Sequence, residues 1–359
     1  MTQNIDLLYQ EVLSLLDELC VIPAPSMKED KRADFVCKWI QTNGFSNVYI
    51  DKAKNVIVEV GDITKGATLI SAHTDIIFDD EKLLLDKKGD RWYCPGIGDD
   101  TANLAVLMVV AKHCLKDSNS PFIIVANSCE EGRGNLYGAK TICEKYGEQI
   151  KRAIVCDGYL GIINDVAVGS IRYEVEVNAK GGHSFRDFGE ESAIVTASEM
   201  ICKLAKIPLP KEGITTYNIG KIYGGTSVNA IPEKCTFTYE IRSDKKENIE
   251  YMKSFASDIF SAPKVALKVI GERPCSHLIN QDEQDALIKR VGKVLGGYGS
   301  VKTYPASTDC NLFLSKNVPA VCIGLLSGGG AHTKQEYIEI SSPKKGILIA
   351  IDLINEFKI

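Results

Sequence analysis

The strongest constraint on the fold is the order in which two kinds of apolar pattern follow one another. Short runs rich in β-branched residues lie at 55–61, 67–75, 121–128 and 152–158, and helical patterns lie between them at 101–116 and 136–147. Alternation of this kind is typical of a buried sheet with helices on both faces. The first half of the chain therefore predicts a three-layer α/β domain.

The pattern changes near Ser170 and changes back after Arg273. Segment 171–179, IRYEVEVNA, alternates apolar and polar residues, which is typical of a sheet with one solvated face. A helix, a hairpin, a second helix and a strand follow, in the β-α-β-β-α-β order of a ferredoxin-like fold. We therefore predict a discontinuous α/β domain, residues 1–169 and 274–359, that is interrupted by an α+β domain at 170–273.

The composition argues against several classes of protein. With 45% hydrophobic and 25% charged residues, the 359-residue chain is typical of a globular protein. A net charge of −5 gives no basic surface for nucleic acid or for an anionic membrane. No apolar run is long enough to span a bilayer, and the start lacks a signal-peptide pattern. Twelve cysteines without a C-x-x-C pair suit reduced thiols, so we expect a cytoplasmic protein.

Imidazole and carboxylate side chains gather at the ends of the predicted strands. The candidates are His73 and Asp75 in SAHTD, Asp99 and Asp100 in GIGDD, Glu130 and Glu131 in SCEEG, Asp157 in VCDG and His332 in GGGAH. Such ligands, without cysteine, suit zinc or a similar divalent ion. Two cations would offset the repulsion between the paired glutamates, so that one binds metal while the other stays free as a base.

Each motif alone has a simpler explanation. A strand-end His is commonly hydrogen-bonded to a nearby partner, and a pair of Asp residues before a helix commonly caps it. A Glu pair before Gly is commonly an acidic loop or first helical turn, and GGGAH is commonly a turn. The occurrence of all the motifs together, in this order and at strand ends, favours a metal site.

With these motifs the chain resembles the dinuclear zinc metallopeptidases that include peptidase T, glutamate carboxypeptidase, aminoacylase and succinyl-diaminopimelate desuccinylase, and it is most similar to peptidase T-like members. SAHTD, GIGDD, SCEEG, CDG and AHTKQEYIEI follow the family's order, and the resemblance covers essentially the whole chain. It implies a zinc-exopeptidase-like αβα catalytic domain with an inserted lid and dimerisation domain, and hence a homodimer.

The resemblance also implies a role for each candidate. Two divalent ions, zinc by expectation with cobalt or manganese as alternatives, would be held by His73 with Asp157 and by Glu131 with His332, with Asp99 as the bridging ligand. Asp75 would orient the imidazole of His73, and Glu130 would be the general base. Asp100 would then cap the helix that begins at Thr101.

The insertion carries three candidate substrate-binding residues. The resemblance implies that His183 in AKGGHSF reaches the neighbouring subunit's active site, with Asn229 of GGTSVNAIP beside it. Arg242 in YEIRSD could bind a substrate carboxylate with both ends of its guanidinium group. The simpler alternatives are turn residues for the first two and an ion pair between Arg242 and Asp244 for the third.

Together these residues predict a metal-dependent hydrolase that cleaves amide bonds of small peptides, as an aminopeptidase or a di- or tripeptidase. Asp157 favours this reading, because in the family Asp at that position is associated with amino- and dipeptidases. An N-acyl-amino-acid deacylase with the same chemistry is the alternative. A binding protein without activity is disfavoured because Glu130 is present. A Rossmann dehydrogenase and a serine hydrolase are set aside because the sequence lacks their G-x-G-x-x-G and G-x-S-x-G motifs.

Overall fold

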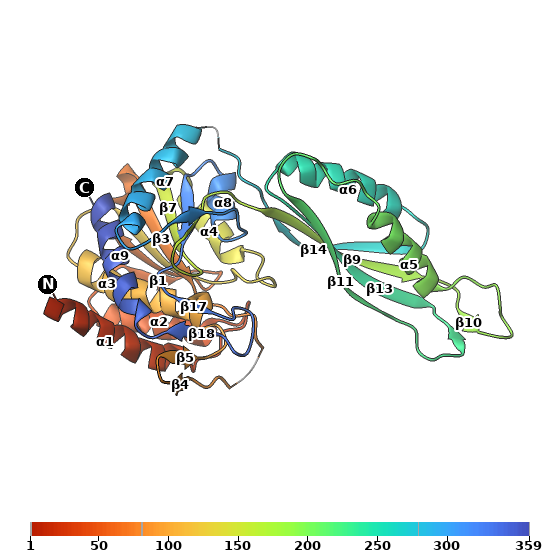
Figure 1. Ribbon diagram of the computed structural model, residues 1–359, viewed down its shortest axis with the longest axis horizontal. Helices are drawn as coiled ribbons and strands as arrows, with labels where there is room; N and C mark the ends of the chain where they lie inside the picture. The colour runs from red at the N-terminus through yellow and green to blue at the C-terminus, as the bar shows by residue number, and fades with distance from the viewer. Residues whose placement is uncertain (1, 80–81, 279, 359) are drawn as a thin grey trace. The chain divides into compact units, whose positions relative to one another are not determined.

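The computed structural model describes residues 2–79, 82–278 and 280–358 (Figure 1). The chain forms two compact units, one made of Met1–Ala167 with His277–Ile359 and the other of Val168–Ser276. These limits lie close to the 170–273 predicted for the insertion. None of the described helices is long and apolar enough to cross a membrane.

An eight-stranded sheet forms the centre of the first unit, in the order β1-β2-β6-β3-β7-β16-β8-β15. The strands are β1 (Val48–Ile50), β2 (Val56–Val60), β3 (Ala67–His73), β6 (Phe122–Asn127), β7 (Ile150–Cys156), β8 (Ile162–Asn164), β15 (Lys302–Thr303) and β16 (Ala320–Ile323). The neighbours β6, β3, β7 and β16 run parallel to one another. Their carboxyl ends therefore meet at one edge of the sheet, where an open α/β sheet places its sites.

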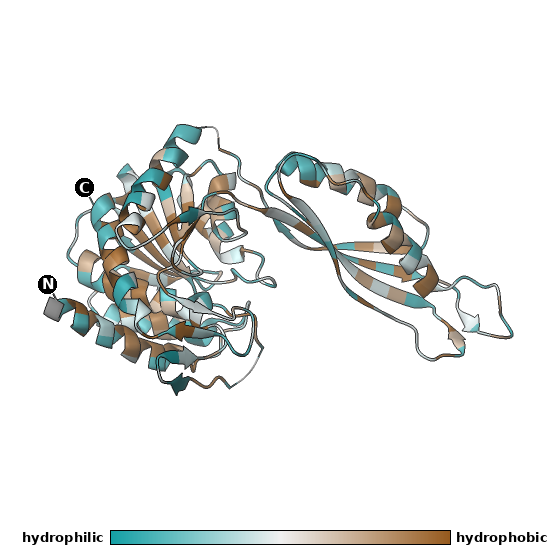
Figure 2. Cartoon of the chain, viewed as in Figure 1, coloured by the Kyte–Doolittle hydropathy of each residue, from teal (hydrophilic) through white to brown (hydrophobic). Residues whose placement is uncertain are grey.

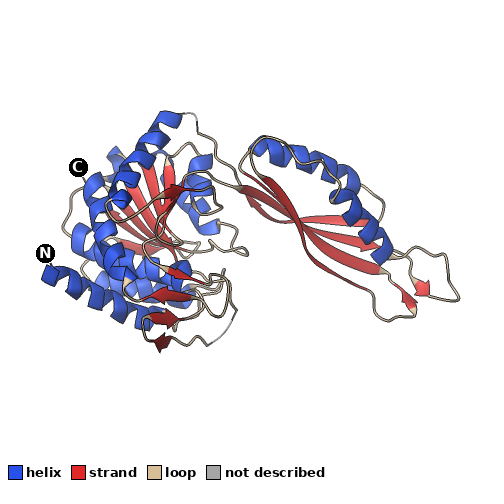
Figure 3. Cartoon of the chain, viewed as in Figure 1, coloured by secondary structure: helices blue, strands red, loops and turns tan. Residues whose placement is uncertain are grey.

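Helices cover both faces of this sheet (Figure 3). They are α1 (Thr2–Leu19), α2 (Asp30–Thr42), α3 (Ala102–Leu115), α4 (Tyr137–Tyr146), α7 (Gln281–Gly296), α8 (Cys310–Ser315) and α9 (Ser342–Phe357). Side chains alternate between the two layers: Ile124 of β6 packs in the core with α1, α3 and α9, whereas Ile123 packs with α4 and α8. Apolar residues follow the strands and the helix sides that face them (Figure 2). The predicted three-layer α/β architecture is confirmed.

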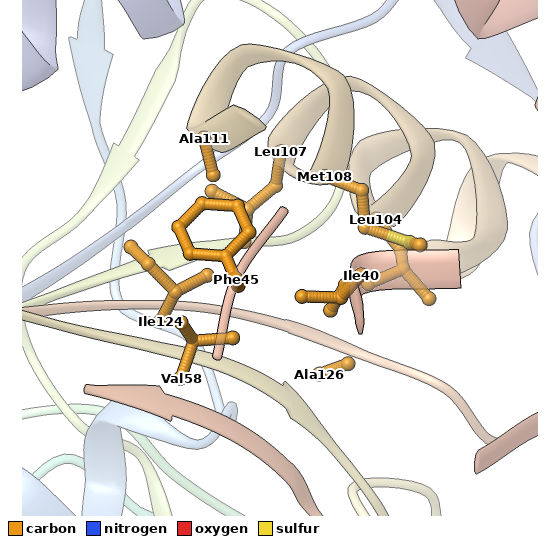
Figure 4. A pocket seen from close by; sticks show the side chains of 9 residues that line it. All are labelled: Ile40, Phe45, Val58, Leu104, Leu107, Met108, Ala111, Ile124 and Ala126. Carbon is orange, nitrogen blue, oxygen red and sulfur yellow. The ribbon is translucent and has the colours of Figure 1, made fainter. Parts of the chain in front are cut away.

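The layer between α2, α3 and the sheet is closely packed. Nine side chains surround a space of ≈ 10 Å³ (Figure 4): Ile40, Phe45, Val58, Leu104, Leu107, Met108, Ala111, Ile124 and Ala126. All nine are apolar, so the space offers a water no hydrogen-bonding partner and is too small for a substrate. This layer therefore supports the sheet and is not a binding site.

A second, small sheet connects two distant parts of the first unit. Its order is β17-β18-β5-β4, made of β4 (Asp86–Lys88), β5 (Arg91–Tyr93), β17 (Gly328–Gly329) and β18 (Tyr337–Glu339). Ile338 of β18 lies opposite Trp92 of β5. Since His332 lies between β17 and β18 and the GIGDD motif follows β5, this pairing brings the two segments together.

The second unit has a four-stranded antiparallel sheet in the order β11-β13-β9-β14. Its elements are β9 (Gly169–Asn178), β10 (Gly182–His183), α5 (Ala193–Leu204), β11 (Thr215–Gly224), β12 (Ala230–Ile231), β13 (Lys234–Ser243), α6 (Lys246–Phe260) and β14 (Val265–Arg273). Residues of α5 and α6 pack in one core with alternate residues of β9 and β13, such as Val175 and Phe237. The predicted α+β insertion with one covered sheet face is confirmed.

Candidate metal centre

Two histidines contact opposite oxygens of one carboxylate at the sheet edge. His73 is buried at the end of β3, and its Nε2 lies 2.9 Å from Oδ1 of Asp99. Nε2 of His332 lies 3.1 Å from Oδ2 of Asp99 and 3.4 Å from Oε1 of Glu131. Potential ligand atoms of His73, Asp99 and Glu131 all lie within 4.8 Å of one another. A carboxylate that offers one oxygen to each side has the geometry of a bridging ligand.

The electrostatics of the cluster call for positive charge. Burial and the negative charge of Asp99 raise the pKa of Asp157 to about 7. Hydrogen bonds to Asp99 and Glu131 raise the pKa of His332 to about 10. Burial opposes ionisation of His73, yet its hydrogen bonds to Asp75 and Asp99 raise its pKa well above the usual value. Bound divalent cations would supply this positive charge, and imidazole and carboxylate donors suit such ions. The residues therefore fit a metal site.

Asp75 holds the paired-glutamate loop as well as lying beside His73. Its Oδ1 accepts a hydrogen bond from the backbone N–H of Glu130 at 2.9 Å, and its Oδ2 accepts one from Glu131 at 3.1 Å and one from Ser26 at 2.6 Å. Nδ1 of His73 lies 3.0 Å from the backbone carbonyl of Asp75 and 3.5 Å from its carboxylate. Both groups of Asp75 thus flank the nitrogen of His73 that faces away from Asp99.

The expectation that Asp100 caps a helix is wrong. Helix α3 begins one residue later than predicted, with Thr101 in the N-cap position, so Asp100 lies outside that position. Its buried carboxylate instead accepts hydrogen bonds from the backbone N–H of His73 at 2.8 Å and from the side-chain amide of Asn103 at 2.6 Å. Asp100 therefore ties the GIGDD loop to the end of strand β3.

Glu336 is a site residue that the sequence analysis missed. Its buried carboxylate accepts hydrogen bonds from three successive parts of the GIGDD loop, the backbone N–H groups of Gly96 at 2.7 Å, Gly98 at 2.8 Å and Asp99 at 2.7 Å. A Cβ on Gly98 would lie 3.1 Å from Oε1 of Glu336 and 2.9 Å from the ring of Tyr159, so a larger residue here would displace these side chains. The available signal was an acidic residue four positions after His332.

Two further buried residues, Arg32 and Asn103, form hydrogen bonds to the loops that carry the candidate ligands. The side chain of Arg32 is buried and donates hydrogen bonds to the carbonyl of Thr74 at 2.8 Å and to Oγ1 of Thr101 at 3.2 Å. Asn103 joins Asp100 to the backbone N–H of Leu325, which its Oδ1 accepts at 2.8 Å. The available signal for Asn103 was a polar residue in an otherwise apolar helical run, whereas nothing in the sequence marked Arg32.

In the second unit, His183 and Asn229 come from adjacent segments. Strand β10 pairs with β12 so that His183 lies opposite Ala230, and the carbonyl of Asn229 accepts the N–H of Ser184 at 3.0 Å. Nδ1 of His183 lies 3.2 Å from the N–H of Phe185 and accepts from it, which assigns the proton of the neutral ring to Nε2. The exposed imidazole can therefore donate a hydrogen bond through Nε2.

Arg242 is separate from this pair. It lies near the last residue of β13, whereas β12 precedes the first. Its Nε donates to Glu240 at 2.9 Å, while the carboxylate of Asp244 accepts from the backbone N–H of Ile214. The alternative ion pair between Arg242 and Asp244 is therefore wrong. Substrate binding by Arg242, His183 and Asn229 stays a prediction.

Comparison with known proteins identifies the family. The model of peptidase family M20/M25/M40 matches residues 69–356, which include the second unit and all the candidate site residues. The chain belongs to this family. The predicted family is thereby confirmed, and membership agrees with the prediction of an enzyme of the metallopeptidase class rather than a binding protein.

Individual M20/M25/M40 relatives carry different activities in their names. An acetylornithine deacetylase from Myxococcus xanthus is 30% identical over 208 residues, which is 54% of this chain and 54% of that relative's length. The fold matches aminopeptidase PepT from Bacillus cereus, with a TM-score of 0.74 and 21% identity over 97% of this chain and 98% of the other. A tripeptidase from Staphylococcus aureus gives a TM-score of 0.75 at 21% identity, over 96% and 98%.

Proposed function

We propose that the protein is a metal-dependent exopeptidase that hydrolyses small peptides with a free N-terminus, as an aminopeptidase or a di- or tripeptidase. The observation that carries this proposal is the convergence of His73, Asp99 and Glu131 within 4.8 Å, with His332 bonded to both carboxylates. These donors come from distant parts of the chain and meet at the carboxyl ends of parallel strands. The overall similarity to PepT and to a tripeptidase supports the peptide substrate.

Two divalent ions fit this donor set. His73 and Asp157 would hold one, Glu131 and His332 the other, and Asp99 would bridge them through its two oxygens. Zinc suits imidazole and carboxylate ligands in this combination, and cobalt or manganese could replace it. When bound, the pair would polarise the scissile carbonyl and lower the pKa of the attacking water.

The residues around the ligands would orient and move the protons. Glu130 would take a proton from the attacking water and pass it to the leaving amine. Asp75 supports this role because it fixes the backbone N–H of Glu130 at 2.9 Å and the imidazole of His73 on its other side. The Nε2 proton of His183, with Asn229 beside it, would bind the substrate carbonyl or carboxylate, and His183 would come from the partner subunit of a homodimer formed through the second unit. Arg242, near the opposite end of β13, would bind a substrate carboxylate separately.

An N-acyl-amino-acid deacylase is the second candidate. It is favoured by the 30% identity to an acetylornithine deacetylase over 54% of this chain. Both reactions hydrolyse an amide with the same catalytic groups, so the residues described so far serve either one.

A panel of substrates separates the two candidates. The zinc-loaded protein should hydrolyse free di- and tripeptides and should leave their N-acetyl and N-succinyl derivatives intact, measured by release of free amino acids. Cleavage of N-acyl amino acids alone would replace the peptidase by the deacylase. Hydrolysis that persists after complete metal removal would contradict both.

A further inference from the structure

A cavity of ≈ 230 Å³ opens beside the candidate metal ligand Glu131. Pro25, Ile76 and Ile77 give it apolar walls, and Asp79 and Arg133 supply charged groups. All of its lining residues belong to the first unit, and none of the roles proposed above uses Asp79 or Arg133. The cavity is large enough for an amino acid side chain.

Besides the ligand Glu131, the charged groups at this cavity are the anion Asp79 and two cations, Arg133, which lines the cavity, and Lys28, which contacts Asp79. Arg133 donates a hydrogen bond to Asp79 through Nη1, and Lys28 lies 3.7 Å from the same carboxylate. Two cations thus share one anion, and Asp79 stays ionised because these neighbours lower its pKa. The side chain of Arg133 is 74% exposed, and its guanidinium group has five N–H donors, so it can bind a second carboxylate without releasing Asp79.

From the cavity and its charges we infer that Arg133 selects substrates that carry a carboxylate on a short apolar stem near the scissile amide. The stem would lie against Ile76 and Ile77, and the carboxylate would pair with the guanidinium group of Arg133. An N-terminal Asp or Glu residue has this chemistry, and so does a dicarboxylic acyl group such as succinyl. The inference rests on the proposed function, because it places the substrate beside Glu131.

The experiment compares substrates that differ only in this carboxylate. The zinc-loaded protein is assayed on Glu-Ala with Gln-Ala, Asp-Ala with Asn-Ala, and N-succinyl-alanine with N-acetyl-alanine. The last pair distinguishes an acyl source of the carboxylate from a side-chain source. In at least one pair, kcat/KM should favour the acidic member by about 10- to 100-fold, the range of a hydrogen bond to a charged group.

Arg133→Gln should bring that ratio close to one and leave hydrolysis of the neutral member unchanged, whereas Arg133→Lys should keep part of the preference. Lys65→Gln removes a charge from another exposed ion pair, that of Lys65 with Asp62, and should not alter the ratio. The inference is overturned if the wild type shows no acidic preference in any pair, or if Arg133→Gln keeps the preference. Arg133 and Asp79 would then form a surface ion pair without a role in selection.

If none of the six compounds is hydrolysed, the proposed function is what fails. Calorimetric titration of the zinc-loaded protein with Glu-Ala and Gln-Ala then decides the inference separately. Tighter binding of Glu-Ala that is lost in Arg133→Gln supports it, and equal or undetectable binding of the two peptides overturns it.

Discussion

Glu130 and Glu131 are adjacent in the sequence, and one carboxylate binds the backbone of both. The backbone N–H groups of both donate hydrogen bonds to the carboxylate of Asp75, which fixes the backbone conformation of this loop. The carboxylate of Glu131 reaches His332 at 3.4 Å and belongs to the candidate ligand group. The proposed division of labour, with Glu131 as ligand and Glu130 as base, rests on the family resemblance, and the contact of Glu131 with His332 supports the ligand role.

Glu130→Gln tests this division. The amide cannot accept a proton, so kcat should fall by about 10²–10⁴-fold, the usual contribution of general base catalysis. Metal content, measured by elemental analysis after gel filtration, should stay at the wild-type value. Glu131→Gln is the matched control and should lose metal together with activity. Loss of metal from Glu130→Gln alone would mean that the two roles are reversed.

The ligand types could be predicted from the sequence because metal chemistry requires them, whatever the fold. His73, Asp99, Glu131 and His332 were all marked by residue type and by their place at the ends of apolar runs. Glu336 could not be marked in this way, because its partners are backbone N–H groups that every residue except proline carries. Which backbone groups point at a carboxylate is decided by tertiary structure alone.

The short strands β5, β17 and β18 bring the ligand segments together, and these are the elements that sequence patterns predict least well. The longer strands β3, β6 and β7 and helix α3 lie within two residues of their predicted ranges. Strands β5, β17 and β18 have two or three residues each, too few to show a period of two. Yet these short strands bring the segment of His332 to the loop of Asp99, and Glu336 fixes the two together.

Glu336→Gln tests this connection. The amide nitrogen of Gln cannot accept the backbone N–H groups that a carboxylate oxygen accepts now. An unsatisfied buried donor lowers the free energy of unfolding by about 1–3 kcal/mol. Metal affinity should fall by about 10- to 100-fold, as for other residues that support ligands. Chelator competition measures the affinity, and thermal unfolding of the metal-free protein measures the stability. Glu339→Gln, on the same strand β18, is the control; equal metal affinity in both variants would refute the role of Glu336.

At the scale of the whole molecule, metal binding and folding are coupled. Without a cation, the carboxylates of the cluster repel one another or take up protons. Metal ions that bind the folded state offset this repulsion and therefore stabilise that state. At a free ion concentration 100 times Kd the gain per site is about 2.7 kcal/mol. Removal of metal by a strong chelator should therefore abolish activity and lower Tm, and zinc, cobalt or manganese should restore both. Unchanged Tm and activity after complete removal would contradict the site.

The homodimer proposed through the second unit makes a stronger prediction, because it requires each active site to contain residues of two chains. Glu130→Gln and His183→Ala should each be nearly inactive as pure proteins. In a mixed dimer, however, the chain with intact Glu130 receives intact His183 from its partner, and this site is complete. Since one of the two equivalent sites is complete in every mixed dimer, the purified mixed dimer should show about half of wild-type activity.

The mixed sample is prepared by co-expression with two affinity tags, and the doubly tagged dimer is purified and assayed on a dipeptide. The reciprocal sample is the purified dimer of a wild-type chain with a doubly mutated chain, Glu130→Gln with His183→Ala. Each of its sites lacks one group if His183 acts across the interface, so it should be nearly inactive, whereas about half of wild-type activity is expected if His183 acts within its own chain. In that case every site in the mixed dimer of the two single variants lacks one group and no activity returns. Restored activity would therefore require His183 and Glu130 of one active site to come from different subunits, which is the arrangement that a dimer through the second unit demands.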